Sequence, residues 1–289
     1  MFSKFILLLI FSYVAVSVND QVICSDNLIA AVKTNPYEAS FSLVIIDPVT
    51  GQETNLFNNY PYFKGKIEHL SIKHPDLCWI IFSFAFDSQN YLQKNQYDLW
   101  AIKTDGSSLI RLTDTLESET SPEASVVNDA IFFSKDGYIH SFFWLDPDKK
   151  TAKTFFKGVA VETSKSSILI ENDRKIYLYD IPTGYQTLVT DNGTRPKFCP
   201  DATCVYFQRG NYIYKVEGFS AVNMGILDVI EGIEIAALQK SLLINKSGQL
   251  YIDDLSDSEP IKRLVDDSFP MTKYYYYSSP DWAQAKANK

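Results

Sequence analysis

The sequence predicts an all-β protein, a six-bladed β-propeller in which the last strand of the chain completes the first blade. Three observations lead to this prediction: a hairpin pattern that recurs every 37 residues, six similar turns, and one strand left over at the C-terminal end. A hairpin repeated at a fixed period is typical of stacked or radially arranged units. The chain has 289 residues, 46% of them apolar, which is enough for a sizeable core.

The 37-residue period is clearest in four successive units. One column of the repeat holds a branched apolar residue, and the next holds an aromatic ring or a histidine. These columns contain Ile139, Ile176, Ile213 and Leu250, followed by His140, Tyr177, Tyr214 and Tyr251. From Ile176 to Tyr179, the residues that alternate between the two faces of the strand are all apolar or aromatic. We therefore expect this strand to be covered on both faces, as in a sheet packed between two other sheets.

Six turns mark six units. Each joins the third strand of a unit to the fourth and is rich in Asp, Gly, Pro or Ser, the residues that turns prefer. They lie at residues 47–51, 104–106, 146–148, 180–184, 216–218 and 255–257.

The two ends of the repeat region predict closure into a ring. Residues 27–57 supply only three strands, and residues 273–278 form a strand with no unit of their own. Docking this strand beside residues 27–33 completes the first unit and leaves only short protected edges. An open solenoid would instead need polar caps, whereas Tyr274 to Tyr277 are all aromatic.

The N-terminal segment has the pattern of a signal peptide. Lys4 supplies one positive charge, an apolar run follows to Val18, and Ala15, Val16 and Ser17 offer small residues for cleavage. The run is shorter than the roughly 20 residues of a spanning helix. We therefore expect residues 1–17 to be removed, residues 18–284 to form one propeller domain and residues 285–289 to be a tail. The product would be secreted or lumenal and free of the membrane, although an uncleaved anchor is the alternative.

Four cysteines in an exported chain favour two disulfides. Cys199 and Cys204 bracket a short turn between two strands, so their side chains can face each other across a hairpin. Cys24 and Cys78 would then pair by exclusion. The alternative is that the cysteines are buried free thiols that pack as small apolar residues.

Two N-glycosylation sequons begin at Asn192 and Asn245. Both fall in predicted turns, which suits modification of an exported eukaryotic protein. Asn, Gly and Ser are also ordinary turn residues, so the sequons have a second explanation.

One repeat resembles a known family. Residues 98–106, Asp-Leu-Trp-Ala-Ile-Lys-Thr-Asp-Gly, followed by Arg111-Leu112-Thr113, resemble the repeat of TolB-like six-bladed propellers and of the dipeptidyl-peptidase IV propeller. Residues 279–282 and 198–201 are similar to the Ser-Pro-Asp turn of those repeats. The resemblance implies the fold only. We expect no room for the additional domain of TolB or the hydrolase domain of the peptidases, and the Gly-His and Trp-Asp pairs of WD40 repeats are absent from the sequence.

Charge and motifs exclude several functions. The net charge of −8 and the pI near 5.0 disfavour a nucleic-acid surface, which needs clustered Lys and Arg. The sequence contains no Gly-x-Ser-x-Gly nucleophile elbow and no Cys/His spacing suited to zinc. A non-enzymatic protein without cofactor or metal is therefore favoured.

The expected binding surface is the mouth of the central channel. Loops that lead into the innermost strands of a propeller surround this mouth, and charged side chains there can bind a ligand or partner. The residues that we expect at these positions are Glu119, Glu123, Glu162, Arg195, Lys197, Glu231 and Glu234. A second candidate is the insertion at residues 87–96, which lengthens one hairpin loop.

Three functions remain open from the sequence. The first is a secreted propeller that binds a protein or peptide through the channel mouth or the 87–96 loop. The second is a calcium-dependent enzyme of the lactonase or lyase kind, with the ion held by carboxylates in the channel. The third is a small-molecule carrier, suggested by 18 Tyr and 19 Phe, although packing between blades also explains these rings.

Overall fold

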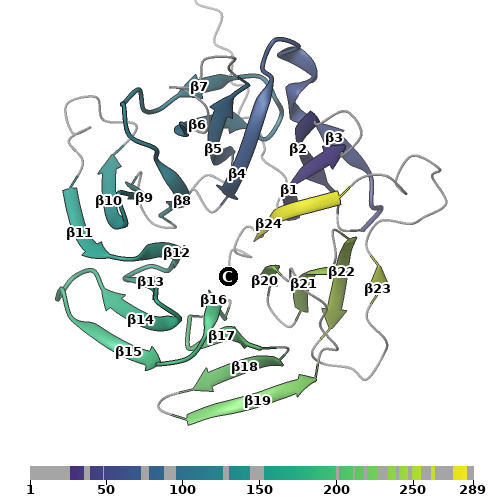
Figure 1. Ribbon diagram of the computed structural model, residues 1–289. Coiled ribbons are helices and arrows are strands. Elements are labelled where there is room, and N and C mark those ends of the chain that lie inside the picture. Colours follow the sequence, from purple (N-terminus) through teal and green to yellow (C-terminus); the bar gives the residue numbers. More distant parts are fainter. Residues whose placement is uncertain are drawn as a thin grey trace, which may run out of the picture.

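The protein is an all-β propeller in which six four-stranded antiparallel sheets surround a central axis (Figure 1). The computed structural model describes residues 27–35, 40–47, 49–72, 78–87, 96–125, 130–143, 153–199, 202–210, 212–217, 220–226, 234–238, 241–246, 249–254, 262–263 and 276–284. The predicted signal peptide, the C-terminal tail and Glu231 lie outside these ranges.

The blades are numbered in chain order, each from its innermost strand outward. Blade 1 contains β24 (Tyr276–Gln284), β1 (Asn27–Asn35), β2 (Ser40–Ile46) and β3 (Glu53–Asn55). Blade 2 contains β4 (Gly65–Ser71), β5 (Trp79–Phe86), β6 (Asp98–Lys103) and β7 (Leu109–Arg111). Blade 3 contains β8 (Thr120–Ala124), β9 (Ala130–Lys135), β10 (Tyr138–Phe143) and β11 (Lys153–Lys157).

The second half of the chain repeats this arrangement. Blade 4 contains β12 (Val159–Thr163), β13 (Ser167–Asn172), β14 (Lys175–Asp180) and β15 (Gln186–Thr190). Blade 5 contains β16 (Thr194–Phe198), β17 (Cys204–Arg209), β18 (Tyr212–Glu217) and β19 (Ser220–Ile226). Blade 6 contains β20 (Glu234–Leu238), β21 (Ser241–Lys246), β22 (Gln249–Asp254) and β23 (Lys262–Arg263).

The last strand closes the ring, as the sequence predicted. β24 pairs with β1 in antiparallel register, with Thr34 opposite Tyr276 and Asn27 opposite Gln284. The innermost strands then contact one another in a closed cycle, β24, β4, β8, β12, β16, β20 and back to β24. Closure joins the two ends of the propeller and leaves no blade incomplete.

Two expectations about this strand were wrong. The described part of the strand runs from Tyr276 to Gln284 and so extends beyond the predicted end at residue 278, while residues 273–275 lie outside the described residues. Residues 279–282, Ser-Pro-Asp-Trp, therefore belong to an innermost strand, whereas we had expected a turn. The pairing shifts register opposite Ala30 to Val32, and this bulge accommodates Pro280 because proline has no N–H for the ladder.

The repeat columns occupy equivalent places in the blades. Ile139, Ile176 and Ile213 are buried. In the next column, His140 stacks on Phe133 and Tyr214 stacks on Phe207, each pair directly opposite across two strands (centroid separation 5.5 Å in both). Cross-strand ring pairs of this kind stabilise a sheet, so the column has a packing role.

The expected burial of β14 on both faces holds only in part. Ile176 and Tyr179 are buried, whereas Tyr177 and Leu178 between them are half-buried. β14 is the third strand of its blade and has only β15 outside it. Its distance from the axis leaves part of each face open to solvent.

Equivalent turns have equivalent hydrogen bonds. In blade 1 the Gly51 N–H donates to the Asp47 carbonyl, and in blade 4 the Gly184 N–H donates to the Asp180 carbonyl, both at 2.8 Å. Both glycines have positive φ, 71° and 75°, a conformation that glycine adopts without strain. These turns were correctly predicted from their composition.

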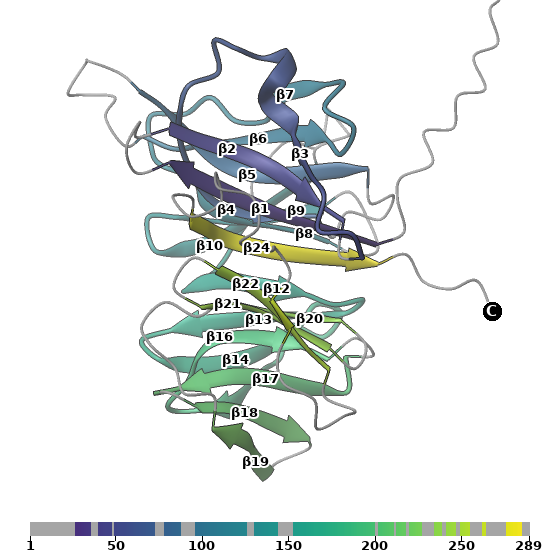
Figure 2. The same cartoon turned by 90° about the vertical axis from the view of Figure 1, so that its right-hand side faces the viewer.

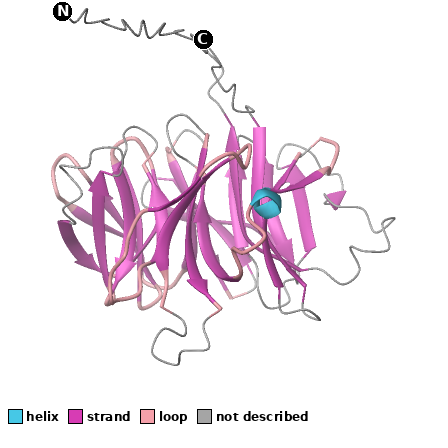
Figure 3. Cartoon of the chain, turned by 90° about the horizontal axis from the view of Figure 1, so that it is seen from above, coloured by secondary structure: helices cyan, strands magenta, loops and turns pink. Residues whose placement is uncertain are grey.

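An aromatic cluster packs blade 2 against blade 1. Phe63 stacks on Phe84 with a centroid separation of 3.9 Å and meets Phe57, Phe86 and Trp100 edge to face. Phe57 comes from the 3-10 helix η1 (Leu56–Asn59), the one helical element among the described residues (Figure 3). The cluster fixes the connection from β3 to β4 on the edge of the ring.

The disulfide between Cys199 and Cys204 is present, with a Cα separation of 5.2 Å. It joins the ends of β16 and β17, where the Cys199 N–H also donates to the Cys204 carbonyl. Cys78 is also disulfide-bonded. Its expected partner Cys24 lies outside the described residues, so that pairing stays a prediction.

The two sequons differ in their local structure. Asn192 lies in the turn between β15 and β16 and is exposed, as expected. Asn245 lies within β21, opposite Glu234 and Leu250, so its predicted place in a turn was wrong because the strand extends to Lys246. In the part of the chain that the structure describes, no helix is long and apolar enough to span a membrane.

Candidate functional site

At one end of the ring the outermost strand of each blade ends and the innermost strand of the next blade begins, and we call this end the crossover face. Each blade has four antiparallel strands, so the chain leaves every outermost strand at the end where the next innermost strand begins. The second strand of a blade ends and the third begins at this same end, as β1 and β2 of blade 1 show in Figure 2. The innermost strands therefore begin around this mouth of the channel.

The predicted mouth residues do not lie together. Glu119 directly precedes β8, Arg195 is the second residue of β16, and Glu234 is the first residue of β20, so these three are on the crossover side. Glu123, Glu162 and Lys197 are each the last residue but one of an innermost strand, and thus near the opposite end. The sequence did not distinguish the beginning of these strands from their end.

Glu123 and Glu162 connect neighbouring blades. The Glu123 carboxylate accepts the N–H of Thr163 at 3.2 Å, and the Glu162 carboxylate accepts the N–H of Phe198. Both glutamates are buried. The hydroxyl of Ser71 accepts the N–H of Ala124 in the same way, at 3.1 Å. These side chains satisfy backbone groups of the next innermost strand, which is a structural role for buried acceptors.

Lys197 occupies the equivalent register position in blade 5. It pairs with Tyr206 on β17, as Glu123 pairs with Phe132 and Glu162 with Leu169. An ammonium group has no acceptor atom. Lys197 therefore cannot accept a backbone N–H of the following blade as the two glutamates do.

A β-bulge places these residues near the end of their strands. Ser121 in β8 and Arg195 in β16 have positive φ, 50° and 53°, and each is followed by a proline. The pairing register shifts at both positions. A bulge inserts an extra residue and changes the direction of the side chains that follow, so the orientation of Glu123 and Lys197 could not be read from simple alternation along the strand.

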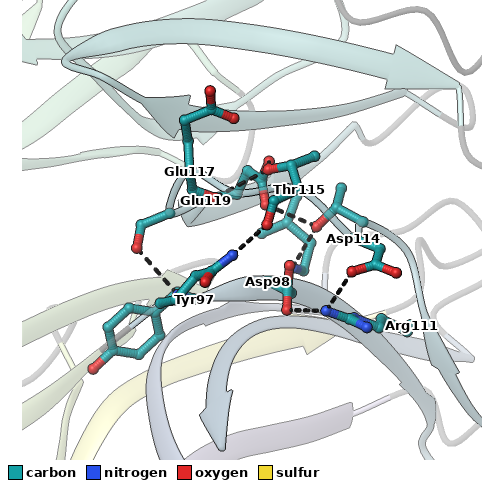
Figure 4. Close-up of polar contacts among 11 residues, drawn as sticks. Tyr97, Asp98, Arg111, Asp114, Thr115, Glu117 and Glu119 are labelled. Atoms are coloured by element: carbon teal, nitrogen blue, oxygen red, sulfur yellow. Dashed lines mark hydrogen bonds and ion pairs between the residues drawn. The ribbon is translucent and has the colours of Figure 1, made fainter. Parts of the chain in front are cut away.

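Glu119 holds the crossover from blade 2 to blade 3 (Figure 4). Its carboxylate accepts hydrogen bonds from the hydroxyl of Thr113 at 3.0 Å and from that of Thr115, and Lys135 lies 3.8 Å away. Only 1% of Glu119 is exposed, and this burial raises the pKa of its carboxyl despite these partners. Its carboxylate therefore serves to hold the loop through these hydrogen bonds.

Asp98 and Arg111 form the second part of this network. Arg111 donates to Asp98 at 2.6 Å and lies 2.8 Å from the exposed Asp114 (Figure 4). Burial raises the pKa of Asp98, although Arg111 opposes the shift. Thr113, two residues after Arg111, accepts the N–H of Leu99 at 2.9 Å. The motif at residues 98–113 thus fastens the outermost strand of blade 2.

Backbone and side-chain bonds attach the 87–96 insertion to both neighbouring crossovers. At its start, the Asp87 N–H donates to the Lys64 carbonyl at 3.2 Å. At its end, the Gln96 amide donates to the Thr115 carbonyl, and the Tyr97 N–H donates to the Ser118 hydroxyl at 3.1 Å. Residues 88–95 lie outside the described ranges. The described ends of the insertion are therefore bonded to different crossovers, Asp87 to the β3–β4 crossover and Gln96 to the β7–β8 crossover.

The tips of these two crossovers carry the most exposed large apolar residues in the described part of the chain. Tyr62 is 94% exposed and Leu116 is 93% exposed. Lys64 lies beside Tyr62, and Asp114 and Glu117 lie beside Leu116, all on the surface. We call the five residues Tyr62, Lys64, Asp114, Leu116 and Glu117 the blade 2 rim.

Further exposed apolar residues lie around the same face. They stand at strand ends on the crossover side, one on each of four strands, at Phe86, Tyr138, Val159 and Tyr212. The opposite face has Val49, Ile181 and Tyr185 in turns between third and fourth strands, and Phe143 at the end of the third strand β10. Exposed apolar surface marks interaction sites, and the crossover face has more of these residues than the opposite face.

Tyr97 links the β7–β8 crossover, through Ser118, to Glu68 on β4. Its hydroxyl donates to Glu68 at 2.8 Å, and Lys66 pairs with the same carboxylate. Burial, together with the bond to Glu68, raises the pKa of Tyr97 to about 12. The phenol therefore stays protonated at neutral pH and serves as a hydrogen-bond donor.

The sequence offered one unused signal for this site. Leu116 is the only apolar residue in the polar run from Thr113 to Thr120, so it fits neither a strand period nor a core position. An isolated Leu in such a run is exposed unless the loop folds back. Among the described residues, no group of three or more His, Cys, Asp or Glu is arranged to hold a metal ion.

Comparison with solved structures identifies the architecture. TolB from Acinetobacter baumannii matches with a TM-score of 0.64 and 12% sequence identity, over 91% of this chain and 68% of that chain. The chain has a TolB-like β-propeller fold. A TolB-like protein from Agrobacterium tumefaciens matches with a TM-score of 0.60 and 12% identity, over 90% of this chain and 99% of that one.

A further match extends beyond TolB. Hydrazine synthase from Kuenenia stuttgartiensis gives a TM-score of 0.63 at 11% identity, and this chain spans 47% of its length. No protein-family model and no curated protein matches the sequence. At 11–12% sequence identity, the similarity between this chain and these proteins shows a shared fold alone.

Proposed function

We propose that the protein is a secreted, non-enzymatic propeller that binds a protein or peptide partner through the blade 2 rim on its crossover face. The observation behind this proposal is the exposure of Tyr62 and Leu116 at the tips of two crossovers that are otherwise closely hydrogen-bonded. Tyr is enriched among the residues that contribute most to binding at interfaces, and burial of an exposed Leu side chain against a partner is favourable.

Rigidity of the loop supports this role. The β7–β8 crossover is bonded through the side chains of Thr113 and Thr115 and through the Glu119 N–H, which donates to the Tyr97 carbonyl at 2.8 Å. A loop already fixed in its bound form loses less conformational entropy on association. Leu116 is thus presented in one position before a partner arrives.

The expected channel-mouth set has a smaller part in this proposal. Glu123 and Glu162 are buried and bonded to the next blade, so they support the ring on which the rim stands. Arg195 and Glu234 lie on the crossover side of the propeller. A long partner could reach them from the rim.

Export and glycosylation belong to the same proposal. The signal-like N-terminus and the disulfide between Cys199 and Cys204 suit an oxidising compartment. Asn192 is exposed, and its carbonyl accepts from the Arg209 guanidinium at 2.6 Å, so the sequon turn is held at the surface. We expect a glycan at Asn192, detectable as a mass loss on enzymatic deglycosylation that the Asn192→Gln variant lacks.

Site-specific photocrosslinking tests the binding role. A photoreactive phenylalanine analogue is placed at Leu116, in a second protein at Tyr62, and in a matched control protein at Val49, which is 86% exposed on the opposite face. Each protein is expressed in its native secretory host. We expect one discrete adduct from position 116 and none from position 49. Equal adducts from both positions, or none from either Leu116 or Tyr62, would contradict binding at the rim.

A further inference from the structure

We infer that the loop of Asp114, Leu116 and Glu117 recognises a basic segment of its partner, in which Lys or Arg side chains flank one or two apolar residues. This inference rests on the proposed function and specifies the chemical character of the partner. The apolar residues would pack against Leu116, and the cations would face the two carboxylates. The argument has three steps: the charge balance of the loop, the exposure of its charges, and the contrast with the neighbouring crossover.

The charge balance of the network is negative. Four carboxylates, those of Asp98, Asp114, Glu117 and Glu119, share two cations. Arg111 lies between the buried Asp98 and the exposed Asp114, and Lys135 between the buried Glu119 and the exposed Glu117. Four negative charges and two positive ones leave an excess of two negative charges.

The negative charges are also the outer ones. The side chains of Asp114 and Glu117 are 80% and 51% exposed, whereas those of Arg111 and Lys135 are 37% and 22% exposed. An approaching molecule therefore meets carboxylates before it meets the cations beneath them. Complementary charge at such a position steers association and selects the partner.

The neighbouring crossover has the opposite charge. Tyr62 is followed by the exposed Lys64, and the next lysine, Lys66, is paired with Glu68 at 2.5 Å. The two apolar tips of the rim thus carry flanking charges of different sign. A basic segment will be directed to Leu116 and away from Tyr62, which gives the inference a test of position as well as of charge.

A displayed library of random twelve-residue peptides, selected on the immobilised full chain, provides the probe. We expect the enriched peptides to contain Lys or Arg within three positions of Leu, Ile, Phe or Trp. Binding of a synthetic enriched peptide, measured by fluorescence anisotropy, should weaken about tenfold or more in Leu116→Ser, which removes the apolar side chain without changing the charge. It should be unchanged in Val49→Ser, an aliphatic surface control. Thermal unfolding of each variant confirms that the fold is kept.

Charge is tested separately from the apolar contact. In the double variant Asp114→Asn with Glu117→Gln, the peptide should bind several-fold more weakly, and its dependence on salt should flatten. Enriched peptides that are neutral or acidic would overturn the inference. So would basic peptides that bind Leu116→Ser as well as the unaltered protein. Peptides weakened by Tyr62→Ser alone would leave binding at the rim intact and refute only the basic partner, whereas peptides sensitive to Val49→Ser alone would contradict both.

Discussion

The Glu123 carboxylate accepts the backbone N–H of Thr163 across the boundary between blades 3 and 4, at 3.2 Å. The Thr163 hydroxyl returns a bond to the Ala124 carbonyl at 2.8 Å. With the equivalent bond from Phe198 to Glu162, these contacts tie three consecutive innermost strands together by side chains. Neighbouring blades of a propeller share no backbone hydrogen-bond ladder. Side-chain contacts of this kind therefore help to hold the ring together.

Replacement of Glu162 should weaken this connection. We expect Glu162→Ala to lower the free energy of unfolding by about 1–3 kcal/mol, because the buried N–H of Phe198 would lose its acceptor. Glu162→Gln keeps an acceptor oxygen and should cost less. The measurement is urea unfolding followed by circular dichroism, with Glu217→Ala as the control, since Glu217 is exposed and forms an ion pair with Lys215 on the same strand. Equal losses from Ala and Gln would mean that the hydrogen bond is not what holds the strand.

Glu119 should give the protein a defined pH dependence. Burial raises its pKa in the folded state, so the folded state binds this proton more tightly than the unfolded one. The associated stability is fully present below the ordinary pKa of Glu and is lost as pH rises through the raised folded value. Glu119→Gln should therefore gain stability relative to the unaltered protein between acidic and neutral pH. Urea unfolding at a series of pH values measures this difference, and a difference that stays constant with pH would refute it.

The disulfide between Cys199 and Cys204 closes a short loop. The two cysteines are separated by five positions, for which the loss of chain entropy in the unfolded state corresponds to about 2 kcal/mol. We expect the double variant Cys199→Ser with Cys204→Ser to unfold at a correspondingly lower urea concentration. Because the turn also has backbone bonds between these residues, the fold should survive. An unchanged midpoint would indicate that the bond is absent in the mature protein.

The fold could be predicted because its signal is periodic. Columns such as Ile139, Ile176 and Ile213 repeat at 37 residues, and each occupies the same buried place in its blade. The turn from Asp180 to Gly184 could likewise be predicted from its own residues. These features depend on residues close in sequence, which is what a sequence displays directly.

The site was predicted less well because its geometry depends on contacts distant in sequence. Glu162 looked like a residue at the start of a strand, yet β12 begins at Val159 after the single residue Gly158 and places Glu162 near its end. Leu116 projects because Tyr97 and Gln96, about twenty positions earlier, hold its loop. No local pattern contains such a contact.

Closure of the ring by β24 is the claim on which the crossover face and its rim depend. It is tested most directly by a designed disulfide between Thr34→Cys on β1 and Tyr276→Cys on β24, whose Cα atoms are partners in the pairing register. Thr34→Cys combined with Thr187→Cys, on a strand of blade 4, is the control. We predict that the first pair forms an intramolecular cross-link in the native protein and raises the midpoint of thermal unfolding, while the control pair stays reduced. Free thiols at positions 34 and 276 in the folded protein would contradict the ring.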